Sequence, residues 1–125
     1  PKIHDLVLRM QMSSLSFILH PRVMKRLSDS SQYGNEYLPN EVLEDIFKGI
    51  FVPREIPSTF KMNLQSAYVD GLIEAMSDGS YDEISRAAIF SSLNKIKNFT
   101  NSAYGNDMVK GHFNYLNWKI NDALD

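Results

Sequence analysis

Apolar residues recur along most of this chain at spacings of three and four, which is the period of an amphipathic α-helix. The clearest such stretch covers residues 59–76. Its apolar positions are Phe60, Leu64, Ala67, Tyr68, Gly71, Leu72, Ala75 and Met76. Ser58 precedes the stretch and can cap the first turn by accepting a hydrogen bond from a backbone amide. We therefore predict a long helix here and expect Leu64, Tyr68 and Leu72 to pack in the core.

Further segments show the same period and are separated by proline, glycine and polar turns. They cover residues 3–19, 21–28, 39–50, 83–98 and 107–124. Pro21 and Pro39 suit the first position of a helix, where a missing amide hydrogen costs nothing. We find no alternating strand pattern and no internal repeat. The chain is therefore predicted to be all-α, a single domain over residues 1–125 built as a bundle of about five or six antiparallel amphipathic helices.

The last predicted helix, at residues 107–124, has an unusually wide apolar surface. One side carries Met108, His112, Tyr115, Leu116, Lys119, Ile120 and Ala123, and Phe113 and Trp118 extend it. We expect His112, Leu116 and Ile120 to pack against the other helices. The segment at residues 3–19 is also apolar over more than one face. In a domain taken from a larger protein, this excess would be a docking surface.

Composition narrows the classes of function. The 125 residues are 43% hydrophobic, which suits one folded domain rather than a disordered chain. A formal net charge of -2 argues against binding to nucleic acid or to an anionic membrane surface. No apolar run approaches the roughly 20 residues of a membrane span. The chain begins at Pro1 without an initiator methionine or signal peptide, so we expect it to be a fragment of a larger protein.

The residues that usually carry chemistry are few and scattered. There is no cysteine, which excludes disulfides and thiolate metal sites. His4, His20 and His112 are isolated, and no HExxH motif, nucleophile elbow or phosphate loop is present. A catalytic or metal centre needs several such groups converging on one point. We therefore predict no catalytic, metal-binding or cofactor-binding residue in this chain. For His112 we favour a packing role, and His20 either stabilises the junction at Pro21 or is exposed.

The charged clusters have ordinary structural explanations. The acidic residues are Glu41, Glu44, Asp45, Asp82 and Glu83. They fall in first turns, where the helix dipole favours negative charge, or on solvated faces. Arg22, Lys25 and Arg26 form a small basic cluster that could pair with an acidic partner, but a solvated face is the favoured interpretation.

Four strings of sequence occur in an order and spacing that resemble a known family. They are residues 19–27 (LHPRVMKRL), 37–51 (YLPNEVLEDIFKGIF), 63–70 (NLQSAYVD) and 111–113 (GHF), the last followed by Ile120 and Leu124. Together they resemble the extreme C-terminal region of large bacterial zinc-dependent metallopeptidases, metzincin-like proteins common in Bacteroidetes. The resemblance covers nearly the whole chain. It departs at Leu38, where those proteins tend to have a capping Thr or Ser.

The resemblance implies a secreted or periplasmic hydrolase as the parent protein. Its catalytic domain would carry an extended HExxHxxGxxH motif, in which zinc-bound histidines and a glutamate base activate water. None of those residues lies in this chain, so no catalytic residue is carried over, and the zinc would belong to the parent's catalytic domain.

This resemblance makes the chain a non-catalytic C-terminal helical domain that braces the catalytic domain of the same parent chain or shapes one wall of its cleft. The alternative is a free-standing helical module for protein–protein interaction. A weaker possibility is a small enzyme whose site forms only on folding. An upstream HExxH motif in the full gene would favour the first hypothesis, and an intact short gene the second.

Overall fold

The computed structural model describes residues 20–30, 50–51, 56–79, 83–100 and 105–125. These residues form four α-helices and no strand: α2 (Pro21–Ser30), α4 (Thr59–Ser77), α5 (Glu83–Thr100) and α6 (Asp107–Leu124). The all-α prediction is confirmed for this part of the chain. The number of helices described is four rather than five or six, because the predicted helix at residues 3–19, and the one at residues 39–50 apart from Ile50, lie outside the described residues.

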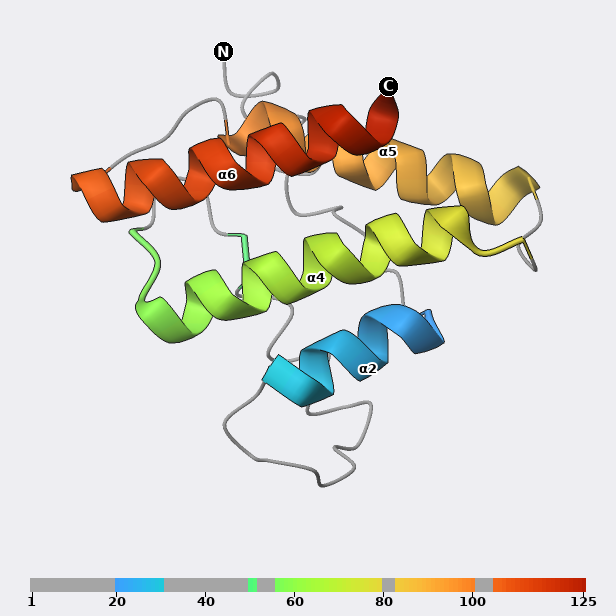
Figure 1. Ribbon diagram of the computed structural model, residues 1–125, viewed down its shortest axis with the longest axis horizontal. Coiled ribbons are helices and arrows are strands. Elements are labelled where there is room, and N and C mark those ends of the chain that lie inside the picture. Colours follow the sequence, from blue (N-terminus) through green and yellow to red (C-terminus); the bar gives the residue numbers. More distant parts are fainter. Residues whose placement is uncertain (1–19, 31–49, 52–55, 80–82, 101–104) are drawn as a thin grey trace, which may run out of the picture.

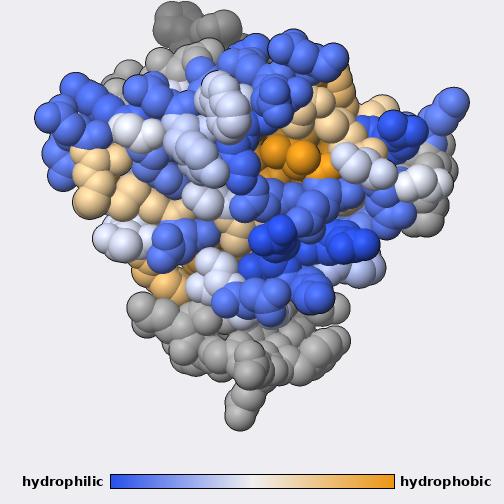
Figure 2. All heavy atoms as spheres, viewed as in Figure 1, coloured by the Kyte–Doolittle hydropathy of each residue, from blue (hydrophilic) through white to orange (hydrophobic). Residues whose placement is uncertain are grey.

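Helix α4 is the centre of the arrangement, since it packs against α2, α5 and α6, and α5 also packs against α6. In Figure 1, α4 lies between α2 and α6. The same view shows α2 and α4 running in opposite directions, as do α4 and α5 and then α5 and α6. This agrees with the antiparallel packing that short connections favour. Figure 2 shows that the face turned to the viewer is largely hydrophilic, with a limited hydrophobic area in the region between α6 and α4.

The helices begin where the sequence supplies caps. The Ser58 side chain accepts a hydrogen bond of 3.2 Å from the Lys61 amide at the start of α4, as predicted. At the start of α6, Asn106 accepts a bond of 3.0 Å from the Val109 amide. Gly105 comes just before this cap and has a φ of 101°, a conformation that glycine adopts without steric cost.

Helix α2 is capped by a histidine. The carbonyl of His20 accepts a hydrogen bond of 2.9 Å from the Met24 amide, and its Nδ1 accepts one of 2.9 Å from the Arg22 amide. The side chain of His20 is buried. The sequence left open whether His20 stabilises the helix junction or is exposed, and the structure assigns it the first role.

The core is a single apolar cluster centred on α4. Its largest fully buried side chains include Leu27, Ile50, Tyr68, Leu72, Ile89, Leu93, Ile96, Leu116 and Ile120. An aromatic series extends it, because Phe51 contacts both Tyr68 and Phe99, and Phe99 contacts Phe113, with ring centroids 5.7 to 6.4 Å apart. Of the six residues expected to pack, Leu64, Tyr68, Leu72, Leu116 and Ile120 are buried and His112 is half-buried.

The predicted faces of α5 and α6 need correction. The spacing of apolar residues in 83–98 predicts a stripe of Ile84, Ala87, Ala88, Ile89, Leu93 and Ile96 on α5, but Ala87 and Ala88 are exposed. In α6 the buried residues are Val109, Phe113, Leu116 and Ile120, so Met108 and Tyr115 point to solvent rather than into the core. Both errors have the same cause. When a helix carries apolar residues on several of its faces, their spacing does not determine which face packs against the neighbouring helices.

Candidate docking surface on helix α6

Three large side chains on α6 are exposed although the opposite side of the helix is buried. The exposed fractions are 61% for Met108, 51% for Tyr115 and 63% for Trp118. We call these three residues the α6 stripe. They are spaced by seven and three positions, so they lie along one side of the helix. Contiguous exposed apolar and aromatic groups are typical of surfaces that bind another protein.

The aromatic part of the α6 stripe is ordered by contacts within the helix. The rings of Tyr115 and Trp118 are stacked, with centroids 6.3 Å apart and planes inclined by 26°. The ammonium nitrogen of Lys119 lies 5.2 Å from the centroid of the Tyr115 ring, a cation–π contact. Tyr115 is therefore in contact with the two residues that lie one turn ahead of it on the helix.

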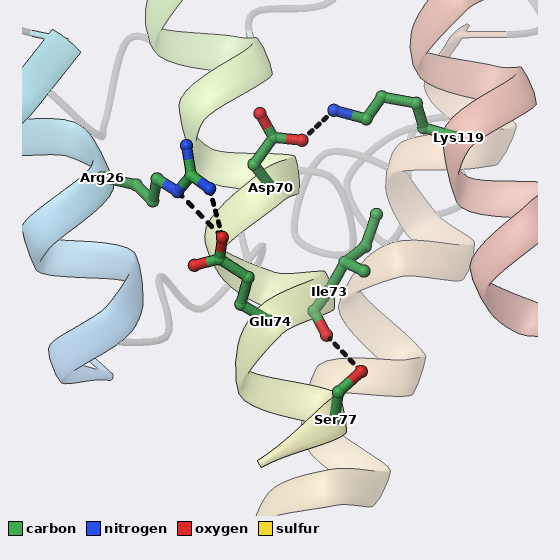
Figure 3. A network of polar contacts seen from close by, with 6 residues as sticks. All are labelled: Arg26, Asp70, Ile73, Glu74, Ser77 and Lys119. Atoms are coloured by element: carbon green, nitrogen blue, oxygen red, sulfur yellow. Dashed lines mark hydrogen bonds and ion pairs between the residues drawn. The ribbon is translucent and has the colours of Figure 1, made fainter.

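Lys119 also connects α6 to the central helix. Its ammonium group forms an ion pair with the carboxylate of Asp70 on α4, and both side chains are mostly shielded from solvent (Figure 3). One turn further along α4, Glu74 pairs with Arg26 of α2, whose Nε donates a hydrogen bond of 3.0 Å (Figure 3). Two carboxylates on α4 therefore each hold a cation from a different neighbouring helix.

The Arg26–Glu74 pair modifies the interpretation of the basic cluster. Arg22 and Lys25 are exposed, as a solvated face requires. Arg26 is exposed as well, but it donates to Glu74, and this hydrogen bond lowers the pKa of the Glu74 carboxyl and raises the pKa of Arg26. This pair could not be predicted from local spacing, because its partners are 48 residues apart.

A cleft lined mainly by polar residues lies along one part of the α2–α4 contact. Its volume is about 300 Å³, and its lining includes Arg26, Asp29, Ser30, Asn63, Ser66 and Asp70. Since Arg26 is paired with Glu74 and Asp70 with Lys119, the charges along this cleft are largely compensated. The cleft therefore favours no particular class of charged ligand.

The half-buried His112 belongs to a series of hydrogen bonds that leads into the core. Its Nε2 lies 2.8 Å from Oε1 of Gln65, and Nε2 of Gln65 donates a bond of 2.6 Å to the carbonyl of Ile50. Since an amide oxygen only accepts, His112 must carry its proton on Nε2 in this arrangement. Burial lowers the pKa of His112, which favours the neutral ring at pH 7.

Gln65 is the residue in this series of hydrogen bonds that the sequence did not single out. It is only 2% exposed. The sequence does show a polar residue directly beside the apolar positions of α4. A buried amide of this kind requires hydrogen-bond partners, which the Ile50 carbonyl and His112 provide.

The other residues considered for chemistry do not come together. His20 caps α2, Glu83 is exposed in the first turn of α5, and His4, Glu41, Glu44, Asp45 and Asp82 lie outside the described residues. In the described part of the chain, no group of three or more His, Asp or Glu side chains could hold a metal ion. None of the helices described is both long and apolar enough to cross a membrane.

No protein-family model matches this chain, and no curated protein or solved structure matches it. The resemblance to the metallopeptidase C-terminal region therefore stays a prediction. The candidate docking surface is therefore argued from the structure alone, and its most distinctive feature is the α6 stripe.

Proposed function

We propose that this chain is a non-catalytic helical domain that docks on another protein surface through the α6 stripe. The observation that supports this most directly is the exposure of Met108, Tyr115 and Trp118 on a helix whose opposite side is fully packed. Leaving such side chains in water forgoes about 1.5–3 kcal/mol for a large apolar side chain such as Met. A partner surface would recover part of that free energy.

The residue types of the α6 stripe also suit a binding role. Tyr, Trp and Met are enriched in the centres of protein–protein interfaces, and Tyr and Trp are frequent among the residues that dominate binding energy. The stacked pair offers a large contact area with few rotatable bonds. These properties favour a protein partner over a small ligand, because the stripe is a convex helix surface and small-molecule sites are concave.

The partner that the sequence resemblance supports is the catalytic domain of the same parent chain, a secreted or periplasmic zinc metallopeptidase. In that protein the zinc ligands and the glutamate base belong to the catalytic domain, and the present helices brace it. A free-standing interaction module would use the same stripe with a separate partner. Gene context separates the two, since the first requires an HExxH motif upstream in the same gene.

Zinc content and peptidase activity test this function directly. Both are measured on the 125-residue chain and on the product of its full gene. We expect about one zinc per molecule and peptide hydrolysis in the full-length product alone. Stoichiometric zinc or hydrolysis in the 125-residue chain would contradict a non-catalytic role, and a full-length product without zinc would contradict the proposed parent.

A further inference from the structure

Among the described residues, a polar connection links the aromatic pair of the α6 stripe to the central helix α4. Tyr115 is in contact with the ring of Trp118 and with the ammonium of Lys119, and Lys119 is in turn paired with Asp70 on α4. Only one fifth of the Lys119 side chain and about a quarter of the Asp70 side chain are exposed. By contrast, Tyr115 and Trp118 are more than half exposed.

We propose that Asp70, acting through Lys119, positions the exposed Tyr115–Trp118 pair. A lysine side chain has four rotatable bonds and loses much entropy when it is held in one conformation. A cation–π contact at an exposed ring is weak and would not fix it alone. The shielded carboxylate of Asp70 supplies the second contact that keeps the ammonium beside the Tyr115 ring. Asp70 is therefore a positioning residue, since it touches neither aromatic ring of the pair among the contacts found.

The consequence for binding is preorganisation. A surface aromatic that already occupies one conformation loses less freedom when a partner covers it. This inference rests on the proposed function only in one respect, namely that the Tyr115–Trp118 pair is used for docking. The positioning itself is a property of the isolated chain and is measured without any partner.

The neighbouring ion pair provides a matched control. Glu74 lies one turn from Asp70 on the same helix and also pairs with a cation from another helix, Arg26 of α2. Figure 3 shows the two pairs directed toward different helices, with only the Lys119 pair reaching α6. Glu74→Gln thus removes the other ion pair of α4 and leaves Asp70, Lys119 and Tyr115 in place.

Trp118 is the only tryptophan in the chain, so its fluorescence reports on the pair without any label. We would measure time-resolved anisotropy of Trp118 in the wild-type chain and in Asp70→Asn, Lys119→Met and Glu74→Gln. Lys119→Met keeps the aliphatic stem of the side chain and removes the charge. Circular dichroism of each variant establishes that the helices are retained.

We expect Asp70→Asn and Lys119→Met each to raise the amplitude of the fast, subnanosecond depolarisation of Trp118, about twofold, on the timescale of side-chain motion. Glu74→Gln should leave it at the wild-type value. If Asp70→Asn does not fold, Lys119→Met is the variant that tests the inference, because it removes the same ion pair. The inference would be overturned if the folded Asp70→Asn and Lys119→Met variants kept the wild-type amplitude of fast depolarisation. It would also be overturned if Glu74→Gln raised this amplitude equally. If the amplitude rises only in Asp70→Asn and Lys119→Met, the positioning role of Asp70 is supported even if the full-length product holds no zinc.

Discussion

At the residue scale, one glycine determines how closely two helices approach. A Cβ atom added at Gly71 would lie 2.6 Å from the Cα of Val23, which is backbone and cannot rotate away. Gly71 on α4 is buried against α2, so the absence of a side chain sets the distance between these helices. The glycine occupies this position for packing rather than for an unusual backbone conformation.

Gly71→Ala should therefore destabilise the chain, by about 1–3 kcal/mol, because α2 and α4 must separate to admit the methyl group. Gly111→Ala is the matched control, since nothing lies within 4 Å of a Cβ added there. Alanine favours helix over glycine, so this second change should stabilise α6 by about 0.5–1 kcal/mol. Urea denaturation of both variants measures the difference, and equal effects of the same sign would contradict the packing argument.

A second prediction at this scale concerns pH. Burial lowers the pKa of His112 in the folded chain, and desolvation does the same for the pKa of His20. The histidines of the unfolded chain have pKa values of about 6.5, so the unfolded chain binds more protons than the folded chain at pH values below this. Stability should rise with pH through this window and fall as the pH is lowered below about 6.5.

His112→Gln tests this assignment, because glutamine can still donate to Gln65 but does not titrate. Urea unfolding between pH 7.5 and pH 5.5 should depend less on pH in this variant than in the wild type. His20, whose pKa is also lowered, should contribute to the slope that remains. The Glu74 carboxyl, whose pKa is lowered by Arg26, contributes mainly at more acidic pH. An unchanged slope would show that His112 does not carry the effect.

At the scale of the element, α4 holds the bundle together because it is buried on more than one side. Its buried residues are Met62, Leu64, Gln65, Ala67, Tyr68, Val69, Gly71, Leu72 and Ala75. Contacts with three other helices explain why burial extends beyond a single stripe. Substitutions at the buried positions of α4 should therefore be among the most costly in the part of the chain that the structure describes.

Leu64→Ala and Leu72→Ala should each lower the free energy of unfolding by about 2–5 kcal/mol, the range for a buried leucine that leaves a cavity. Leu72 is completely buried and Leu64 nearly so. Asn63→Ala, an exposed position of the same helix, serves as the control and should cost far less. Thermal or urea unfolding is the measurement. A melting curve that either leucine substitution leaves unchanged would be incompatible with this packing.

At the scale of the whole molecule, the α6 stripe does not pack against the core that the described helices form. Truncating Trp118 should therefore have little effect on the 125-residue chain, below about 1 kcal/mol, because the ring is mostly exposed. In the full-length product Trp118→Ala should loosen docking and speed proteolytic release of the helical domain. Phe90→Ala is a suitable control, since Phe90 is 48% exposed but lies on α5. Identical proteolysis of both variants would remove the α6 stripe as the interface.

Much of the local structure follows from the sequence. The spacing in residues 59–76 predicts α4 to within one residue of its end at Ser77, because a helix buried on several sides still has apolar groups at every turn. Ser58 and Pro21 mark helix starts through chemistry that involves only their near neighbours. For α2 and α5 the ends fall two residues later than expected, at Ser30 and Thr100.

The candidate site could not be predicted in the same way. The apolar excess of α6 is visible in the sequence, but which side stays exposed depends on how α6 meets α4 and α5. The pairs Lys119–Asp70 and His112–Gln65 join residues 49 and 47 positions apart. Periodicity and capping act over a few residues and determine the helices, whereas contacts over such distances exist only after the helices pack. Local sequence patterns were therefore enough to locate the four described helices, whereas the exposed side of α6 and the polar contacts behind it depend on tertiary packing.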